Sequence, residues 1–144
     1  MEAKLKAQVR RRAGFRCEYC QFPERHSGLR FQMDHIIAEK HGGRTQSTNL
    51  ALACFRCNSH KGPNLSGVDP LSSQVVRLFH PRRDEWLEHF VWHGPKLSGL
   101  TAIGRTTIAV LRINRPDAVL VRAALLEEGL SLVPSGRRKL RSSE

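Results

Sequence analysis

Cys17-Glu-Tyr-Cys20 and Cys54-Phe-Arg-Cys57 are the two stretches that decide the fold, because each places two thiols three positions apart. Together they supply the four thiolates that a structural Zn2+ site prefers, and they use every cysteine of the 144-residue chain. Disulfides or a redox site are the alternative use of four cysteines. The first residues lack the apolar segment of a secretory signal, so we expect structural Zn2+ in a cytoplasmic protein.

Asp34 and His35 lie side by side between the two cysteine pairs, in an apolar stretch over residues 29–37. This stretch is typical of a β-strand, on which adjacent side chains point to opposite faces. We therefore expect the carboxylate to bind a metal while the imidazole, directed elsewhere, activates a water. A Gly-Gly turn at 42–43 is expected to reverse the chain before a second short apolar segment at 50–53.

This pair of residue types suits the hydrolysis of a phosphodiester bond. Imidazole titrates near neutrality and serves as a general base, and a divalent cation neutralises the charge that develops on the phosphate oxygens. An Asp-His pair in isolation is usually an ordinary surface pair. Its position inside the cysteine frame favours the hydrolytic interpretation.

The stretch that contains CEYC and MDHIIAEKHGGRTQSTNLALACFRCNSHKG resembles the HNH endonucleases of the ββα-metal, or His-Me finger, class. The resemblance covers about residues 15–62 and implies a β-hairpin followed by a short helix. It also implies a catalytic divalent metal between hairpin and helix, with nucleic acid lying across the hairpin. By this resemblance His35 is the general base, Asp34 is a metal ligand, and Asn49 holds the loop and orients the histidine.

The last motif position holds Asn58, whereas many members of the family carry a histidine there. His60 is the alternative ligand. Positions two apart on a helix lie about 200° apart, however, so these two side chains should not face one metal. We prefer Asn58, whose amide oxygen suits Mg2+ or Mn2+, and we assign His60 a contact with phosphate.

The chain has a formal net charge of +11 and a pI near 10.6, which indicates a polyanionic partner. DNA is the partner that the resemblance implies, and RNA stays open because no residue tests for a 2′-hydroxyl. No stretch approaches the ~20 apolar residues that span a bilayer, so no membrane partner is expected. The basic residues expected to contact nucleic acid are Arg10, Arg11, Arg12, Lys61, Arg82, Arg83 and Arg105.

Composition and patterning divide the chain into four segments. We expect a basic N-terminal helix over residues 1–14, the HNH core with its zinc site over 15–62, an extension over 63–133, and a basic disordered tail over 134–144. The predicted fold class is α+β. It combines a ββα-metal core, held by a four-cysteine zinc site, with a mixed, mainly helical C-terminal extension.

The extension opens with residues 63–70, which are expected to be a turn-rich linker. A short strand is predicted at 90–92 and a helix at 104–114. A further helix is predicted with Pro116 in its first turn and Gly129 as its stop. This half resembles, more loosely, the extension of a group of small bacterial HNH proteins. It is interpreted either as an arm along the nucleic acid or as a packing cap over the core.

Two functions from different classes fit these patterns. The first is a metal-dependent HNH endonuclease that hydrolyses phosphodiester bonds in DNA. The second is a non-catalytic, zinc-stabilised module that binds nucleic acid, or a subunit of a larger nucleoprotein machine. A purely structural zinc module has no need for the Asp-His pair and two asparagines together, so their combination favours the endonuclease.

Overall fold

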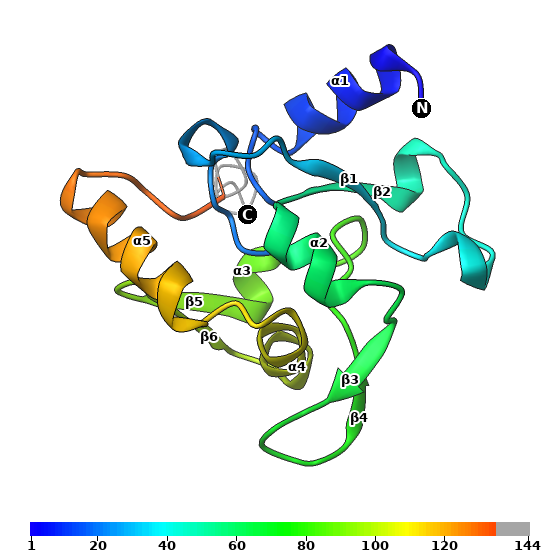
Figure 1. The fold of residues 1–144 in the computed structure, drawn as a ribbon. Coiled ribbons are helices and arrows are strands. Elements are labelled where there is room, and N and C mark those ends of the chain that lie inside the picture. The colour runs from blue at the N-terminus through cyan, green and yellow to red at the C-terminus, as the bar shows by residue number, and fades with distance from the viewer. Residues whose placement is uncertain (135–144) are drawn as a thin grey trace, which may run out of the picture.

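The computed structural model describes residues 1–134, which form five α-helices and three two-stranded antiparallel sheets (Figure 1). The elements are α1 (Ala3–Arg12), β1 (Gln32–His35), β2 (Leu50–Ala53), α2 (Phe55–Lys61), β3 (Ser66–Val68), β4 (Val75–Arg77), α3 (Trp86–His89), β5 (Phe90–His93), β6 (Lys96–Gly99), α4 (Ala102–Leu111) and α5 (Pro116–Glu127). The predicted α+β class is confirmed. Apart from Pro134, the predicted tail lies outside the described residues.

Strands β1 and β2 form the first hairpin, and α2 follows β2 directly (Figure 1). All four residues of β2 are buried, which accounts for its uninterrupted apolar sequence. The edge of β2 away from β1 is paired as well. Glu18 N donates to Leu52 O at 2.8 Å, and the Glu18 carboxylate accepts from Leu52 N at 2.9 Å. The first cysteine pair is thereby joined to the hairpin through its own backbone.

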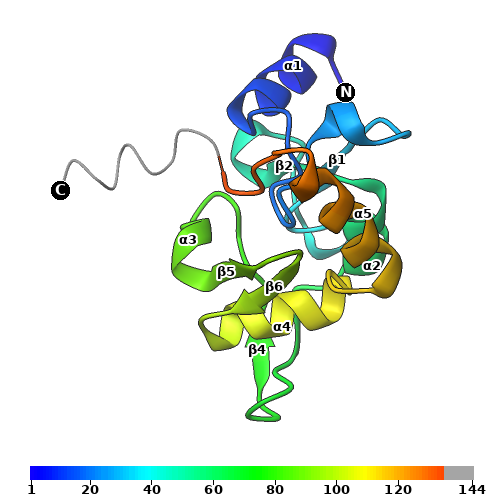
Figure 2. The same cartoon turned by 90° about the vertical axis from the view of Figure 1, so that its left-hand side faces the viewer.

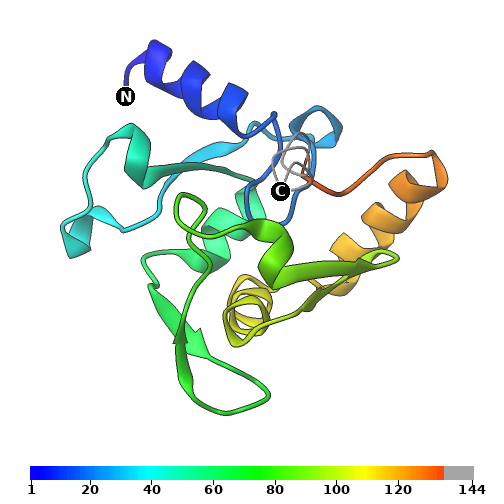
Figure 3. The ribbon, with the colours of Figure 1, turned by 180° about the vertical axis from the view of Figure 1, so that it is seen from behind.

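The prediction of a linker over residues 63–70 is wrong, because this segment contains β3, which pairs with β4 in a projecting hairpin (Figures 1 and 3). Gly67 lies in the strand itself and allows β3 to pack closely on α4. A Cβ atom at this position would lie 2.3 Å from Val110 Cγ2. Asp69 closes the turn by accepting hydrogen bonds from Leu71 N and Ser72 Oγ.

The other elements predicted in the extension agree more closely with the structure. Strand β5 covers the predicted segment, and β6 pairs with it. The helix predicted at 104–114 is α4, which begins two residues earlier because Thr101 caps it by accepting a hydrogen bond from Gly104 N. Helix α5 begins at Pro116 and ends before Gly129, which adopts a φ of 90°. None of the helices in residues 1–134 is long and apolar enough to cross a lipid bilayer.

Aromatic side chains join the extension to the cysteine-containing half. Trp86 donates its indole N–H to Tyr19 O at 2.9 Å, and the Phe79 ring lies 6.5 Å from the Tyr19 ring. Phe90 packs 5.0 Å from Trp86 and 5.3 Å from Phe79. These buried rings belong to the same apolar cluster as the cysteines. Extension and hairpin therefore share one core (Figure 2).

Replacing Asp69 by Asn tests how the projecting hairpin is held on α4. Arg105 donates two hydrogen bonds to the Asp69 carboxylate, at 3.0 and 2.9 Å, and these hold the pKa of that carboxyl below its usual range. A lowered pKa means that the stabilisation is present above the unfolded-state pKa of about 3.9 and is lost as the pH falls through the folded-state value.

We therefore expect Asp69→Asn to melt below the wild type at neutral pH, with a difference that is constant above about pH 5 and shrinks towards acid. Thermal unfolding followed by circular dichroism between about pH 3 and pH 8 measures this. Asp117→Asn is the matched control, because Asp117 also pairs with arginines but lies at the surface, where such pairs contribute little. A pH-independent difference would show that the Asp69 charge is not what holds the hairpin.

Candidate functional site

The four cysteines converge on one point between the hairpin, α2 and the loop that follows α1. Their sulfur atoms all lie within 4.8 Å of one another, and Cys20 Sγ is 3.9 Å from Cys54 Sγ. Zn–S bonds of about 2.3 Å in tetrahedral geometry separate the sulfurs by roughly 3.8 Å. None of the four thiols is in a disulfide. The cluster therefore fits a single tetrahedral metal ion such as Zn2+.

Local backbone geometry holds each cysteine pair in the shape that this cluster needs. Cys20 N points at Cys17 Sγ at 3.5 Å, and Cys57 N points at Cys54 Sγ at 3.4 Å. The second contact also caps the N-terminus of α2. After Cys20 the chain reverses through Gln21, whose φ of 66° is left-handed and whose N donates to Cys17 O at 2.8 Å.

Burial raises the pKa of the Cys17 thiol. Zinc would oppose that effect by binding the thiolate form, so loading the cluster releases protons and its metal affinity increases with pH.

Asp34 lies between β1 and α2, on the buried side of the strand. The Tyr19 hydroxyl donates to its carboxylate at 2.6 Å, and Lys61 Nζ lies 3.3 Å from both carboxylate oxygens. Asp34 is only 4% exposed and Lys61 only 2%. Burial raises the pKa of the Asp34 carboxyl, while Lys61 and the Tyr19 hydrogen bond act against that rise. The carboxylate is thus satisfied by two neighbours from the protein.

His35 is partly exposed, while its strand neighbour Asp34 is buried. The side chains of His35 and Asp34 therefore lie on opposite faces of the strand, as expected for adjacent positions. His35 Nε2 lies 2.8 Å from the Thr45 hydroxyl, in the loop between the two strands. In the tautomer in which Nε2–H donates to Thr45, the lone pair of the neutral ring is on Nδ1.

Asn49 ties the loop together just before β2. Its Oδ1 accepts from Ile37 N at 2.9 Å, and its Nδ2 donates to Ile37 O at 3.0 Å and to Arg44 O at 2.9 Å. The side chain is buried, so these bonds replace water for three backbone groups. One amide side chain thereby sets the path of the chain on both sides of the loop that carries Thr45.

Asn58 and His60 occupy different sides of α2. Asn58 Nδ2 donates to Gln32 Oε1 on β1, two positions before Asp34, so Asn58 faces the hairpin. His60 faces the extension instead, where burial and the charges of Arg115, Arg112 and Arg56 lower its pKa. The structure brings Asn58 to the face of the hairpin that carries Asp34, and it places His60 among arginines.

Several of the basic residues expected to contact nucleic acid are used inside the protein. Arg10 pairs with Glu24 at 3.2 Å and donates to Phe31 O. Arg12 donates to Leu50 O at 2.8 Å and to the Ser47 hydroxyl at 2.7 Å. Both arginines connect α1 to the loops around the hairpin. Their positive charge is therefore partly used for structure.

The same holds at three further predicted positions. Lys61 is buried against Asp34, which removes it from the surface and does not fit the predicted contact with nucleic acid. Arg82 pairs with Glu18, and Arg105 pairs with Asp69. Of the seven predicted positions, the exposed ones are Arg11, Arg12 and Arg83, and Arg12 also makes the hydrogen bonds described above.

Tyr19 and Lys61 are the contacts of Asp34 that sequence reasoning missed. The burial of Lys61 could have been predicted, because Lys61 lies four positions after Cys57 and so on the same, buried side of α2. The sequence around Tyr19, between the two cysteines of the first pair, does not predict its contact with Asp34. Its hydroxyl is 15 positions from Asp34 in the chain, and only the folded structure brings them together.

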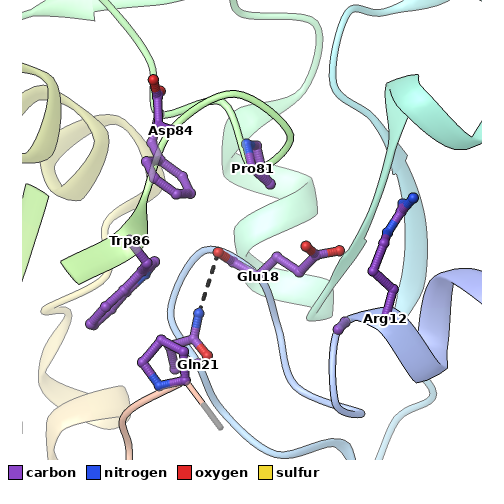
Figure 4. A pocket seen from close by; sticks show the side chains of 9 residues that line it. Arg12, Glu18, Gln21, Pro81, Asp84 and Trp86 are labelled. Carbon is purple, nitrogen blue, oxygen red and sulfur yellow. Dashed lines mark hydrogen bonds between the residues drawn. The ribbon is translucent and has the colours of Figure 1, made fainter. Parts of the chain in front are cut away.

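A small cavity lies between the first cysteine pair and the extension, lined by Arg12, Glu18, Gln21 and Trp86 among others (Figure 4). Its volume is about 30 Å³. A cavity needs roughly 10–15 Å³ to hold one water molecule, so this one has room for water but not for a substrate.

Metal removal tests the cysteine cluster. We expect the purified protein to contain one zinc ion per chain and its cysteines to react with Ellman's reagent only after chelation, with all four then titrating. Chelation should also lower the melting temperature sharply, because metal binding contributes directly to folding. Zinc-free protein without reactive thiols, prepared without reductant, would instead indicate disulfides.

Comparison with known proteins gives one result. No curated protein and no solved structure matches the chain, whereas residues 17–64 match the family model described as HNH endonuclease. The match begins at the first cysteine of the cluster and ends shortly after α2. It includes both cysteine pairs, the whole hairpin and the helix. Residues 17–64, one third of this chain, are therefore similar to an HNH endonuclease domain.

Proposed function

We propose that the protein is a metal-dependent endonuclease that hydrolyses phosphodiester bonds in DNA, with His35 as its general base. The observation that carries this proposal is the position of His35, at the end of a strand whose other face holds Asp34 and faces Asn58, within an HNH domain. Hydrolysis of a phosphodiester uses a general base to activate water and oxygen ligands to hold a cation. This chain has candidates for both, and its positive charge suits a polyanionic substrate.

His35 would take the proton from the attacking water. With its Nε2–H donating to Thr45, the ring is oriented and Nδ1 is the nitrogen that accepts the proton. The loop that carries Thr45 is held by the three hydrogen bonds of Asn49. Asn49 is therefore a positioning residue, which acts on the histidine through the loop.

Asp34 and Asn58 are the residues that would hold a catalytic Mg2+ or Mn2+ ion. Their donor atoms, a carboxylate oxygen and an amide oxygen, are hard ligands of the kind these cations prefer. Such an ion, when bound, neutralises charge on the phosphate and leaving oxygens. The donor set fits, with the condition that the cation must share Asp34 with Lys61 and Tyr19.

DNA is the proposed substrate, and the net charge of +11 supports affinity for a polyanion. Arg11 and Arg12 on α1 and Arg83 in the extension are the predicted contacts that are exposed and so have access to phosphates. Backbone contacts of this kind position a protein on nucleic acid without reading its sequence. We therefore propose weak sequence preference for this chain.

One observation favours the second candidate, a non-catalytic module that binds nucleic acid. Asp34 and Lys61 form a buried ion pair, and Lys61 Nζ also lies within hydrogen-bonding distance of His35 O and Ile36 O. A carboxylate used in this way contributes to packing between β1 and α2 whether or not a cation binds. The two candidates therefore differ in what Asp34 does, and replacing that residue separates them.

Replacing His35 by Ala should lower the rate of nicking of supercoiled plasmid with Mg2+ or Mn2+ by about 10²–10⁴-fold, the usual contribution of a general base. Zinc content and melting temperature should stay near those of the wild type, because His35 is partly exposed. His41→Ala is the control, since His41 is an exposed histidine in the loop that follows β1. Nicking by His35→Ala at the wild-type rate would assign the base to another group.

Replacing Asp34 by Asn keeps the shape of the side chain but removes the charge. If Asp34 holds the cation, metal-stimulated nicking should fall by about a hundredfold or more, because the cation supplies several kcal/mol of transition-state stabilisation. Asp69→Asn is the matched control, since it makes the same change at another buried carboxylate that pairs with a basic side chain. If Asp34→Asn and Asp69→Asn nick plasmid at equal rates, after correction for the folded fraction, Asp34 has only a structural role.

A further inference from the structure

A groove of about 290 Å³ lies between α2, α5 and the loop at residues 26–29, and Cys20, Cys54 and Cys57 of the cysteine cluster form part of its lining. Figure 2 shows α5 beside α2, and Arg56 on α2 lies 3.7 Å from Asp117 on α5. The volume is near the lower end of the roughly 300–1,000 Å³ range of small-molecule sites. The groove thus has room for one planar ring system and not for a helix.

The walls of this groove are apolar side chains that the fold leaves in water. Phe55 is 46% exposed, Leu29 is 58% exposed and Val121 is 49% exposed, and all three line the groove. They come from α2, the loop and α5, so three separate elements contribute. Single exposed apolar residues are common in proteins, but convergence of several in one concave site is typical of a binding surface.

The rim of the groove is positively charged. Arg56 and Arg115 both line it, and they share a single carboxylate, Asp117, at 3.7 and 3.3 Å. Two guanidinium groups against one carboxylate leave a net positive charge. An apolar slot with a cationic rim complements a nucleotide, whose base is a flat ring and whose phosphate is an anion.

The groove opens next to the proposed cation site. Phe55 and Asn58 are three positions apart on α2, and side chains at this spacing are neighbours on one side of a helix. Asn58 faces β1, while the Phe55 ring lines the groove. A nucleic acid strand that crosses α2 at Asn58 therefore passes Phe55 within the length of about one nucleotide.

We propose that this groove binds one unpaired nucleobase of the nucleic acid, stacked on Phe55, while Arg56 and Arg115 contact the adjoining phosphate. The inference rests on the proposed function, because it assumes that the HNH domain binds nucleic acid. A base within a duplex is covered by its neighbours and must leave the stack to enter such a site, which costs free energy. The preferred substrate is therefore DNA with an unpaired nucleotide beside the cut, as at a gap or a flap.

The test measures binding without cleavage. The zinc-loaded full chain with His35→Ala is titrated, at one fixed salt concentration, onto two fluorescent DNAs of the same sequence, a continuous duplex and a duplex with a two-nucleotide gap. We expect about 5-fold or tighter binding to the gapped DNA. Adding Phe55→Ala should weaken gapped binding by between about 5-fold and about 150-fold, the loss of one base–aromatic stack, and duplex binding by less than about 2-fold.

Phe15→Ala is the matched control, because Phe15 is 51% exposed and is absent from the lining of the groove. It should leave both affinities unchanged, and Phe55→Trp should keep the preference for gapped DNA because the indole also stacks. Arg56→Ala should weaken binding to both DNAs, and titrations repeated over a series of salt concentrations should show a salt dependence smaller by about one phosphate contact. Zinc content is checked in each variant.

Equal affinity for the two DNAs, or a Phe55→Ala variant that binds gapped DNA like its parent, would overturn the inference. Plasmid nicking by the chain with His35 intact separates this failure from that of the proposed function. If nicking persists, the proposed endonuclease function is retained and only the base-binding groove is rejected. A chain that binds neither DNA would remove both.

Discussion

The convergence of four thiols is the constraint on which the rest of this structure depends. Cys20 and Cys54 are 34 positions apart, and their sulfurs lie 3.9 Å from each other. Closing so long a loop costs conformational entropy, which a bound metal offsets in the folded state. The closure sets β2 beside the first cysteine pair and directs α2 back across β1. Every candidate catalytic residue lies on an element whose direction follows from that closure.

The extension completes this arrangement from the other side. Trp86 donates to the backbone of Tyr19, and the Tyr19 hydroxyl donates to Asp34, which in turn pairs with Lys61. A continuous path of buried polar contacts thus runs from the extension to the strand that carries the candidate base. Of the two interpretations of the extension, packing over the core is the one with observed contacts. Contacts of Arg83 with nucleic acid remain a proposal.

The charge of the chain is distributed less simply than its composition indicates. Basic groups contribute to the net charge of +11, yet Arg10, Arg82 and Arg105 are paired with carboxylates. Arg122 is 2% exposed, donates to Pro95 O and lies 5.1 Å from the centre of the Trp92 ring. Guanidinium groups are used here as multidentate donors that satisfy backbone carbonyls and buried acids. Net charge predicts the class of partner, but it does not identify the residues that meet it.

The sequence by itself determined the features that depend on local spacing. The two C-x2-C pairs predicted the metal cluster, the short apolar segment expected at 50–53 is the buried strand β2, and Pro116 with Gly129 predicted the limits of α5. The order Asp-His on a strand predicted side chains on opposite faces. These features need only the geometry of a turn, a strand or a helix.

Only the tertiary structure decided which charges are buried and which segments pair. Lys61 became the partner of Asp34 because α2 folds back on β1, and residues 66–68 became a strand because Gly67 meets α4, which lies much later in the chain. Burial of a charged group and pairing of a short strand are set by neighbours that are distant in sequence. The spacing of Lys61 from Cys57 places it on the buried side of α2, but no local pattern around Lys61 or Gly67 contains the distant neighbours themselves.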